Sequence, residues 1–137
     1  MLDDNMDSSK IARYGFSSWC EFSLTNKQEV LEKAGNQIGN YVIRYGKGNF
    51  CRFRGYSDIL YIGKSTDDQH GMRTRVSSYF KPGSTQWTNK RTHSFLEKQL
   101  PMEISFKIHP NPKEFETQLL EQYLNDHDEL PPFNRTQ

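Results

Sequence analysis

Four residues with complementary phosphate chemistry occur in order along the chain. Tyr41 and Tyr61 lie in separate apolar segments, Arg75 follows them, and Glu121 comes late in the sequence. A guanidinium binds phosphate through two hydrogen bonds, a carboxylate can hold a divalent cation, and a phenol can take part in proton transfer. Phosphodiester hydrolysis needs these abilities together, so the set favours cutting nucleic acid over merely binding it.

The two tyrosines lie in segments with the pattern of β-strands. Residues 41–45 alternate in side-chain character, and residues 58–62 form a second apolar run that ends at Gly63. Residues 46–57 between them are rich in glycine and arginine. The short, turn-rich connection favours a hairpin of two neighbouring strands.

Helical segments and a third strand complete the pattern. Residues 26–37, 71–80 and 87–100 read as helices, and Pro112 begins a last one. Residues 104–108 alternate apolar and polar side chains, which is the cleanest strand pattern in the chain. The prediction is an α/β (α+β) fold in which helices flank a small, three-stranded, mixed or antiparallel sheet.

The length of 137 residues suits one domain with its own core. We expect residues 1–38 to be an N-terminal extension and helix packed on a domain of residues 39–137. Cys20 and Cys51 fit no metal-ligand spacing and are expected to be reduced thiols. No apolar run is long enough for a membrane, and the polar start of the chain lacks a signal-peptide pattern. These features predict a cytoplasmic or nucleoid-associated protein with no membrane partner.

Positive charge gathers in the middle of the chain. Residues 44–91 contain ten Lys or Arg and three Asp, a net charge of +7, although the whole chain carries only +1. Such a basic stretch is typical of a surface that binds a nucleic-acid backbone. A solvated, charge-rich surface without a ligand is the alternative.

Four cations in this stretch are the candidates for contact with DNA: Arg52, Arg54, Lys90 and Arg91. Aromatic residues lie among them, and Trp87 can stack on a base or insert into a duplex. Equally well, Trp87 could pack over the domain's own core.

Five short segments in this order resemble the GIY-YIG nuclease family. They are Gly39-Asn40-Tyr41, Tyr61-Ile62-Gly63-Lys64, Arg75-Val76-Ser77-Ser78-Tyr79-Phe80, Glu116-Thr117-Gln118-Leu119-Leu120-Glu121 and Pro132-Phe133-Asn134. Asn40 stands where the family usually has Ile or Val. The resemblance covers most of the chain and implies a three-stranded sheet flanked by helices.

The resemblance also implies roles for individual residues. It makes Tyr41 the residue that accepts a proton from the attacking water, Arg75 a phosphate ligand and Glu121 the ligand of Mg²⁺ or Mn²⁺. Asn134 would tie the C-terminal tail to the site. The implied catalytic set is Tyr41, Tyr61, Lys64, Arg75, Tyr79 and Asn134.

Some assignments stay open at this level. On the last helix, periodicity points to Glu116 as the carboxylate nearer the apolar face, whereas the resemblance favours Glu121. Arg75 could instead form a surface ion pair, with Arg73 taking its place. Tyrosines in strands often serve only sheet packing, and Tyr79 could equally fill the core.

The leading hypothesis is a Mg²⁺-dependent DNA endonuclease, with a homodimer as one route to double-strand cutting. The alternative is a catalytically inactive nucleic-acid-binding module of the same fold. An enzyme acting on another phosphodiester is a third possibility.

Overall fold

The computed structural model describes residues 5–135 as an α+β fold. Residues 1–4 and 136–137, the ends of the two predicted regions, lie outside the described residues. The predicted fold class is confirmed. No helix among the described residues combines the length and apolar character that spanning a bilayer demands.

The main sheet has four strands in the order β1-β6-β2-β5, and all neighbouring strands are antiparallel. Its three long strands are those predicted: β2 (Gly39–Tyr45), β5 (Ile59–Ser65) and β6 (Met102–Ile108). The fourth, β1 (Cys20–Glu21), is an addition of only two residues. It pairs with β6, so part of the predicted N-terminal extension closes that side of the sheet.

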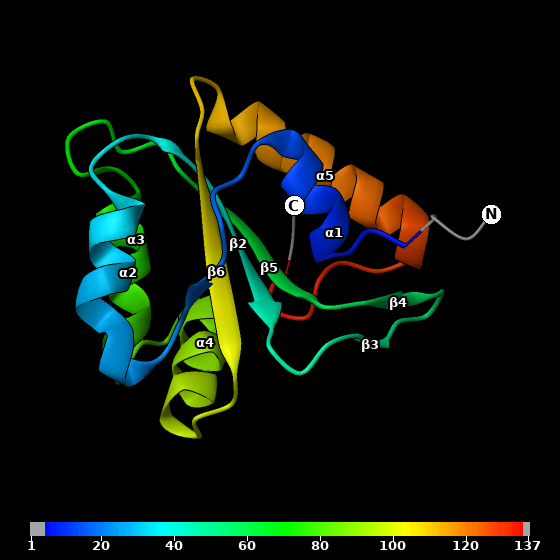
Figure 1. The fold of residues 1–137 in the computed structure, drawn as a ribbon, viewed down its shortest axis with the longest axis horizontal. Helices are drawn as coiled ribbons and strands as arrows, with labels where there is room; N and C mark the ends of the chain where they lie inside the picture. The colour runs from blue at the N-terminus through cyan, green and yellow to red at the C-terminus, as the bar shows by residue number, and fades with distance from the viewer. Residues whose placement is uncertain (1–4, 136–137) are drawn as a thin grey trace.

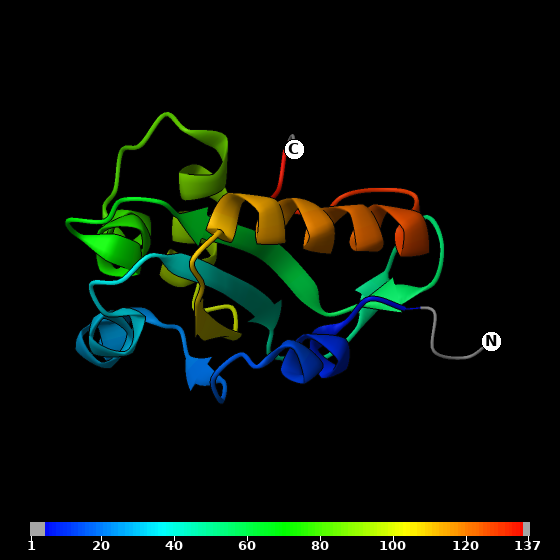
Figure 2. The same cartoon turned by 90° about the horizontal axis from the view of Figure 1, so that it is seen from above.

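Helices cover both faces of the sheet, which explains why the strands are apolar on both sides (Figure 1). One face carries α2 (Lys27–Ala34), α3 (Gly71–Ser77) and α4 (Trp87–Glu97). The other carries α1 (Ser8–Ile11) and α5 (Pro112–His127). Figure 2 shows the same separation from above.

The central strand β2 and the edge strand β5 therefore contribute to two cores, whereas the buried apolar residues of β6 all belong to the core under α2, α3 and α4. In β2, Tyr41 and Ile43 pack toward α2, α3 and α4, whereas Val42 packs against α5. The β2–β5 register shifts between Ile43 and Arg44, a bulge close to the point where the strands leave the sheet. Before the bulge the register is regular and sets Tyr41 opposite Gly63.

The connection between β2 and β5 contains its own small sheet, β3 (Phe50–Cys51) and β4 (Tyr56–Ser57). It extends beside the end of α5 in both views of the molecule (Figure 1 and Figure 2). Three short 3₁₀ turns complete the fold, η1 (Ala12–Tyr14), η2 (Leu24–Asn26) and η3 (Ser78–Phe80). The predicted helix over residues 71–80 is thus α3 continued by η3.

Candidate active site

Three tyrosine rings meet on the sheet face covered by α2, α3 and α4. Tyr41 comes from β2, Tyr61 from β5 and Tyr79 from η3. The ring centroid of Tyr41 lies 6.0 Å from that of Tyr61 and 6.2 Å from that of Tyr79, and the centroids of Tyr61 and Tyr79 are 6.3 Å apart. The hydroxyls of Tyr41 and Tyr79 are hydrogen-bonded at 2.6 Å. We call these three residues and Arg75 the phenol cluster.

Gly63 allows the two strand tyrosines to approach each other. A Cβ atom at this position would lie 2.5 Å from the ring of Tyr61 and 2.7 Å from that of Tyr41. Both distances are far below normal contact, and the obstacles are rings packed in a core. The glycine of the Tyr61-Ile62-Gly63 segment is therefore needed for the rings to lie over the backbone of β5.

Arg75 reaches the cluster because α3 is fixed at its start. The Met72 amide donates to the Gln37 carbonyl at 3.0 Å, and Gly71 has a φ of +66° where a side chain would strike the backbone of Asn36. One turn later, the guanidinium of Arg75 interacts with the three phenols. Arg73, the alternative arginine, is exposed.

Burial raises the pKa of two phenols in the cluster, those of Tyr41 and Tyr79. Burial, then the neighbouring Tyr61, raises the pKa of Tyr41 far above its usual range, although Arg75 acts in the opposite direction. Burial likewise raises the pKa of Tyr79. Burial acts to lower the pKa of Arg75, but the surrounding phenols outweigh it and raise this pKa. At neutral pH the buried phenols of Tyr41 and Tyr79 therefore keep their protons beside the Arg75 cation.

The cluster opens to solvent through a pocket of about 390 Å³ at the edge strand β5, which we call the edge pocket. Tyr61 and Arg75 line it, whereas Tyr41 and Tyr79 are fully buried and do not. Lys64 and Glu116 also line the pocket and form an ion pair at 3.1 Å. The lining residues are Tyr61, Lys64, Ser65, Thr66, Asp67, Gly71, Thr74, Arg75 and Glu116.

Asn40 fixes the start of α5 against β5. Its buried side-chain amide donates to the carbonyl of Pro112 at 2.9 Å and to that of Gly63 at 3.3 Å. Glu116 lies about one helical turn after Pro112, so this link sets the distance between its carboxylate and the pocket. Asn40, which stands where the resembled family usually has Ile or Val, thus has a defined positioning role here.

The structure does not bring Glu121 to the pocket. It lies five residues after Glu116, about 140° further around an α-helix, and its side chain is exposed. Moreover, α5 covers the sheet face opposite the phenol cluster, and Glu116 is close only because it lies beside the edge strand. The carboxylate suggested by periodicity, not the one favoured by resemblance, is at the site.

Asn134 ties the C-terminal tail to β5, as expected. Its side-chain oxygen accepts from the Ile62 amide at 3.0 Å, and its side-chain nitrogen donates to the Ile62 carbonyl at 2.9 Å. The Phe133 amide adds a bond to the Leu60 carbonyl at 2.8 Å. Asn134 therefore binds β5 at Ile62, the residue that follows Tyr61.

Searches of family models, curated proteins and solved structures find no match to this chain. The GIY-YIG resemblance consequently depends on the five short segments and on the placement of their residues. Four of the predicted residues lie together in the phenol cluster: Tyr41, Tyr61, Arg75 and Tyr79. Lys64 and Asn134 lie next to it, and Glu116 rather than Glu121 lines the edge pocket.

Two of the predicted DNA-binding cations are used inside the fold. Arg52 pairs with Glu129 at 2.9 Å and donates to the Leu130 carbonyl at 2.7 Å. Arg54 pairs with Asp128 at 3.2 Å. Lys90 and Arg91 are exposed on α4 beside the tail, and Arg54 is exposed as well despite its ion pair. The acidic partners of the hairpin arginines follow them by more than 70 residues, so local charge could not reveal them.

The donor set at the edge pocket fits a hard cation held mostly by water. No group of three or more His, Cys, Asp or Glu side chains suited to a metal occurs within residues 5–135. Glu116 and Asp67 are the two carboxylates that line this open, polar pocket, and Mg²⁺ is often bound through one or two carboxylates with several waters. A cation there would compete with Lys64 for the Glu116 carboxylate.

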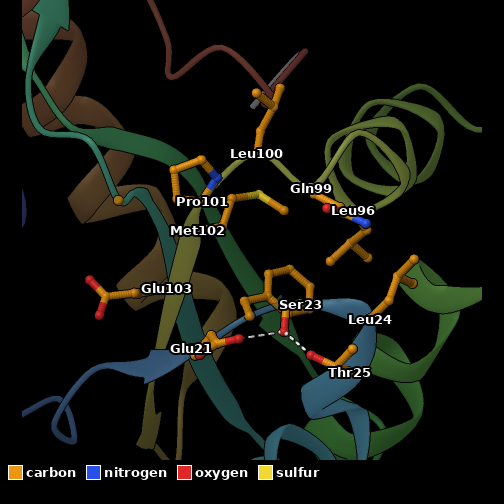
Figure 3. Close-up of a pocket in the computed structure, with 12 residues that line it drawn as sticks. Glu21, Ser23, Leu24, Thr25, Leu96, Gln99, Leu100, Pro101, Met102 and Glu103 are labelled. Carbon is orange, nitrogen blue, oxygen red and sulfur yellow. Dashed lines mark hydrogen bonds between the residues drawn. The ribbon is translucent and has the colours of Figure 1, made fainter.

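A larger pocket of about 560 Å³ lies elsewhere, between η2, the end of α4 and the start of β6 (Figure 3). Its walls include Phe22, Leu96 and Met102, and its polar rim includes Ser23, whose hydroxyl donates to Glu21 at 2.7 Å. None of the predicted catalytic residues lines it. Its size alone does not make it the reactive site.

Proposed function

We propose that this chain is a metal-dependent DNA endonuclease that hydrolyses a phosphodiester bond. The observation that carries the proposal is the convergence of Tyr61, Lys64, Arg75 and Glu116 on one solvent-open pocket beside two further buried phenols. Cation, phenol and carboxylate on three separate elements are the groups that phosphodiester hydrolysis uses. Binding alone would not require a carboxylate on the wall of a phosphate pocket, because it repels the ligand.

Arg75 and Lys64 would hold the scissile phosphate. The guanidinium of Arg75 lies beside the phenols, which raise its pKa, so it stays charged and offers its donors to the phosphoryl oxygens as negative charge develops. Lys64 leaves Glu116 to contact the same group. Water attacks phosphorus and loses a proton, the bond from phosphorus to the 3′ oxygen breaks, and the departing 3′ oxygen takes up one proton, so that water is divided between the two products.

Tyr61 is the phenol positioned to contact the attacking water. It lines the pocket, whereas Tyr41 is fully buried and keeps its proton because burial raises its pKa. We therefore assign Tyr61 the direct role and Tyr41 a positioning role through Tyr79. Glu116 would hold Mg²⁺ or Mn²⁺, which supplies charge stabilisation to the phosphoryl oxygens when bound.

Matched carboxamide variants on α5 test the proposal. We expect Glu116→Gln to reduce nicking of a supercoiled plasmid in Mg²⁺ or Mn²⁺ by about 10²-fold or more, since the metal's carboxylate ligand is removed. Glu121→Gln is the control, because it removes the same charge from the exposed face of the same helix. Melting curves verify folding. Equal nicking by both variants and the wild-type chain would refute the assignment.

A nucleic-acid-binding module without turnover is the second candidate. The ion pair between Lys64 and Glu116 supports it, because this carboxylate is already neutralised without a metal. Metal-independent, salt-sensitive binding with no plasmid nicking in either metal would establish it.

One pocket acts on one strand at a time, so double-strand cutting would require a second copy of the chain on the same duplex. Sedimentation of the protein with and without a short duplex tests this expectation. A cytoplasmic or nucleoid-associated location is part of the same proposal.

A further inference from the structure

A second basic pocket lies at the start of α4, where the C-terminal tail passes. It has a volume of about 350 Å³ and is lined by Thr85, Trp87, Lys90, Arg91, Ser94 and Arg135. We call it the tail pocket. It shares no lining residue with the edge pocket. Three of its six residues are cations and none is acidic, so its chemistry is that of an anion site.

Its two arginines are held in place by an indole ring. The guanidinium carbon of Arg91 lies 4.2 Å from the ring centroid of Trp87, and that of Arg135 lies 5.3 Å from it. Interactions at these distances are attractive and restrict a long side chain without using its hydrogen-bond donors. The planar donors therefore remain available to an oxygen-rich ligand.

No carboxylate pairs with these cations in the part of the chain that the structure describes. Salt bridges within 4 Å involve Arg44, Arg52 and Arg54, but not Lys90, Arg91 or Arg135. Positive groups brought together without an acidic partner repel one another. An external anion would relieve that repulsion.

The tail that carries Arg135 is anchored. The hydroxyl of Thr88 donates to the Phe133 carbonyl at 2.8 Å, and the rings of Phe95 and Phe133 pack edge-to-face at 4.9 Å. Asn134 is bonded to Ile62, the residue after Tyr61. The tail pocket thus adjoins the edge strand that supplies Tyr61 to the edge pocket.

We infer that the tail pocket binds a backbone phosphate of the strand whose scissile phosphate lies in the edge pocket. This inference rests on the proposed function, and it adds Arg135, Arg91 and Lys90 as the residues that set the path of the strand. A phosphate is favoured over a base because guanidinium groups already lie against the indole ring. The two pockets would then hold the strand along the outer edge of β5.

Binding without cleavage gives the direct test. A labelled single-stranded oligonucleotide is titrated in EDTA at several salt concentrations, and fluorescence anisotropy is recorded. For the double variant Arg91→Gln and Arg135→Gln, we expect affinity to fall several-fold. The slope of log K against log salt should shrink by about 0.7 for each phosphate that the variant no longer neutralises. Lys90→Gln should produce a smaller change in the same direction.

The control removes the same charge elsewhere. Lys98→Gln with Lys113→Gln takes two exposed cations from the far end of α4 and from the start of α5. An equal reduction of affinity and slope in this control would overturn the site, because net charge alone would then explain the effect. Unchanged binding by the Arg91 and Arg135 double variant would overturn it as well.

The fluorescence of Trp87 reports binding at the tail pocket whether or not the DNA is cleaved. In a Trp19→Phe background Trp87 is the sole tryptophan, so oligonucleotide binding should change its fluorescence. If the wild-type chain binds with this signal but cuts nothing, the endonuclease proposal fails and the phosphate site stands. If it cuts DNA while Trp87 fluorescence never responds to bound oligonucleotide, the phosphate site fails and the endonuclease proposal stands.

Discussion

Arg75 and Arg52 come from the same basic stretch of sequence, yet their surroundings are opposite. Arg75 lies among the three tyrosine side chains and faces an open pocket. Arg52 is enclosed by Glu129, the Leu130 carbonyl and the rings of Phe50 and Tyr123. The first cation has no acidic partner within 4 Å among the described residues, whereas the second is paired with a carboxylate and a carbonyl of the fold. The comparison teaches that the partners of an arginine, rather than local charge density, decide whether it is available to a ligand.

The largest expected effect comes from Arg75→Gln. The variant removes the cation that interacts with the buried phenols, and with it the preorganised charge that the phosphate would meet. We expect kcat/KM for plasmid nicking to fall by about 10²–10³-fold. If Arg75→Gln nicks DNA at the wild-type rate while folded, the contrast between the two arginines has no functional meaning.

Gly63→Ala should disturb the phenol cluster through packing. The added methyl group would meet both the Tyr41 and Tyr61 rings, so we expect a decrease of roughly 1–3 kcal/mol in unfolding free energy, together with reduced nicking. Gly46→Ala is the control, since its Cβ would meet Pro101 at 2.9 Å, away from the phenols. Urea melts and nicking assays on both should show a stability cost in each but reduced activity only in Gly63→Ala. Normal activity in Gly63→Ala would contradict the packing argument.

Arg52→Gln should reduce stability and leave nicking nearly unchanged, the opposite of what we expect for Arg75→Gln. Glu129 and the Leu130 carbonyl would lose their partner, so the free energy of unfolding should drop by about 1–3 kcal/mol. Nicking, measured well below the melting temperature, should stay within about twofold of wild type because Arg52 is remote from the edge pocket. A strong loss of DNA binding in the folded variant would show that Arg52 contacts DNA, as the sequence suggested.

The smallest expected effect is alkaline destabilisation. Burial raises the pKa of Tyr41 above the value near 10 of a free phenol, so the unfolded chain loses this proton first as pH rises. Stability from this group is complete below pH about 10 and declines above it by about 1.4 kcal/mol per pH unit. Urea melts between pH 9 and about 11 should decline less steeply for Tyr41→Phe than for wild type. Tyr56→Phe, on an exposed residue, is the control.

Part of the site was predictable because short-range patterns determine it. Alternation along residues 41–45 and 104–108 identifies two neighbouring strands, and the glycine after Ile62 has a steric cause that its position suggests. Helical periodicity on the last helix also pointed to Glu116, since that residue lies nearest the face formed by Phe115 and Leu119. The resemblance favoured Glu121 by the Leu119-Leu120-Glu121 segment and by the distance to Asn134 along the sequence, neither of which reports the orientation of the helix.

What could not be predicted depends on long-range partners. Arg52 meets Glu129 only because the β3–β4 hairpin folds against the end of α5. Arg135 has no distinguishing pattern in the sequence, because its importance comes from its closeness to Trp87 on α4. The strand β1 was missed since two residues carry no period. Burial of Tyr41 likewise follows from the packing of η3 over β2, and no local pattern records it.

The amide of Asn134 has a consequence for self-association. By occupying both the N–H and the C=O of Ile62, it blocks the outer side of β5 against strand addition by another molecule. On the far side of the sheet, the segment containing β1 shields β6 in the same manner, through the Ser17 and Phe22 amides. Two copies brought together on a duplex would have to meet through helices or loops, which leaves each pocket free to face its own strand.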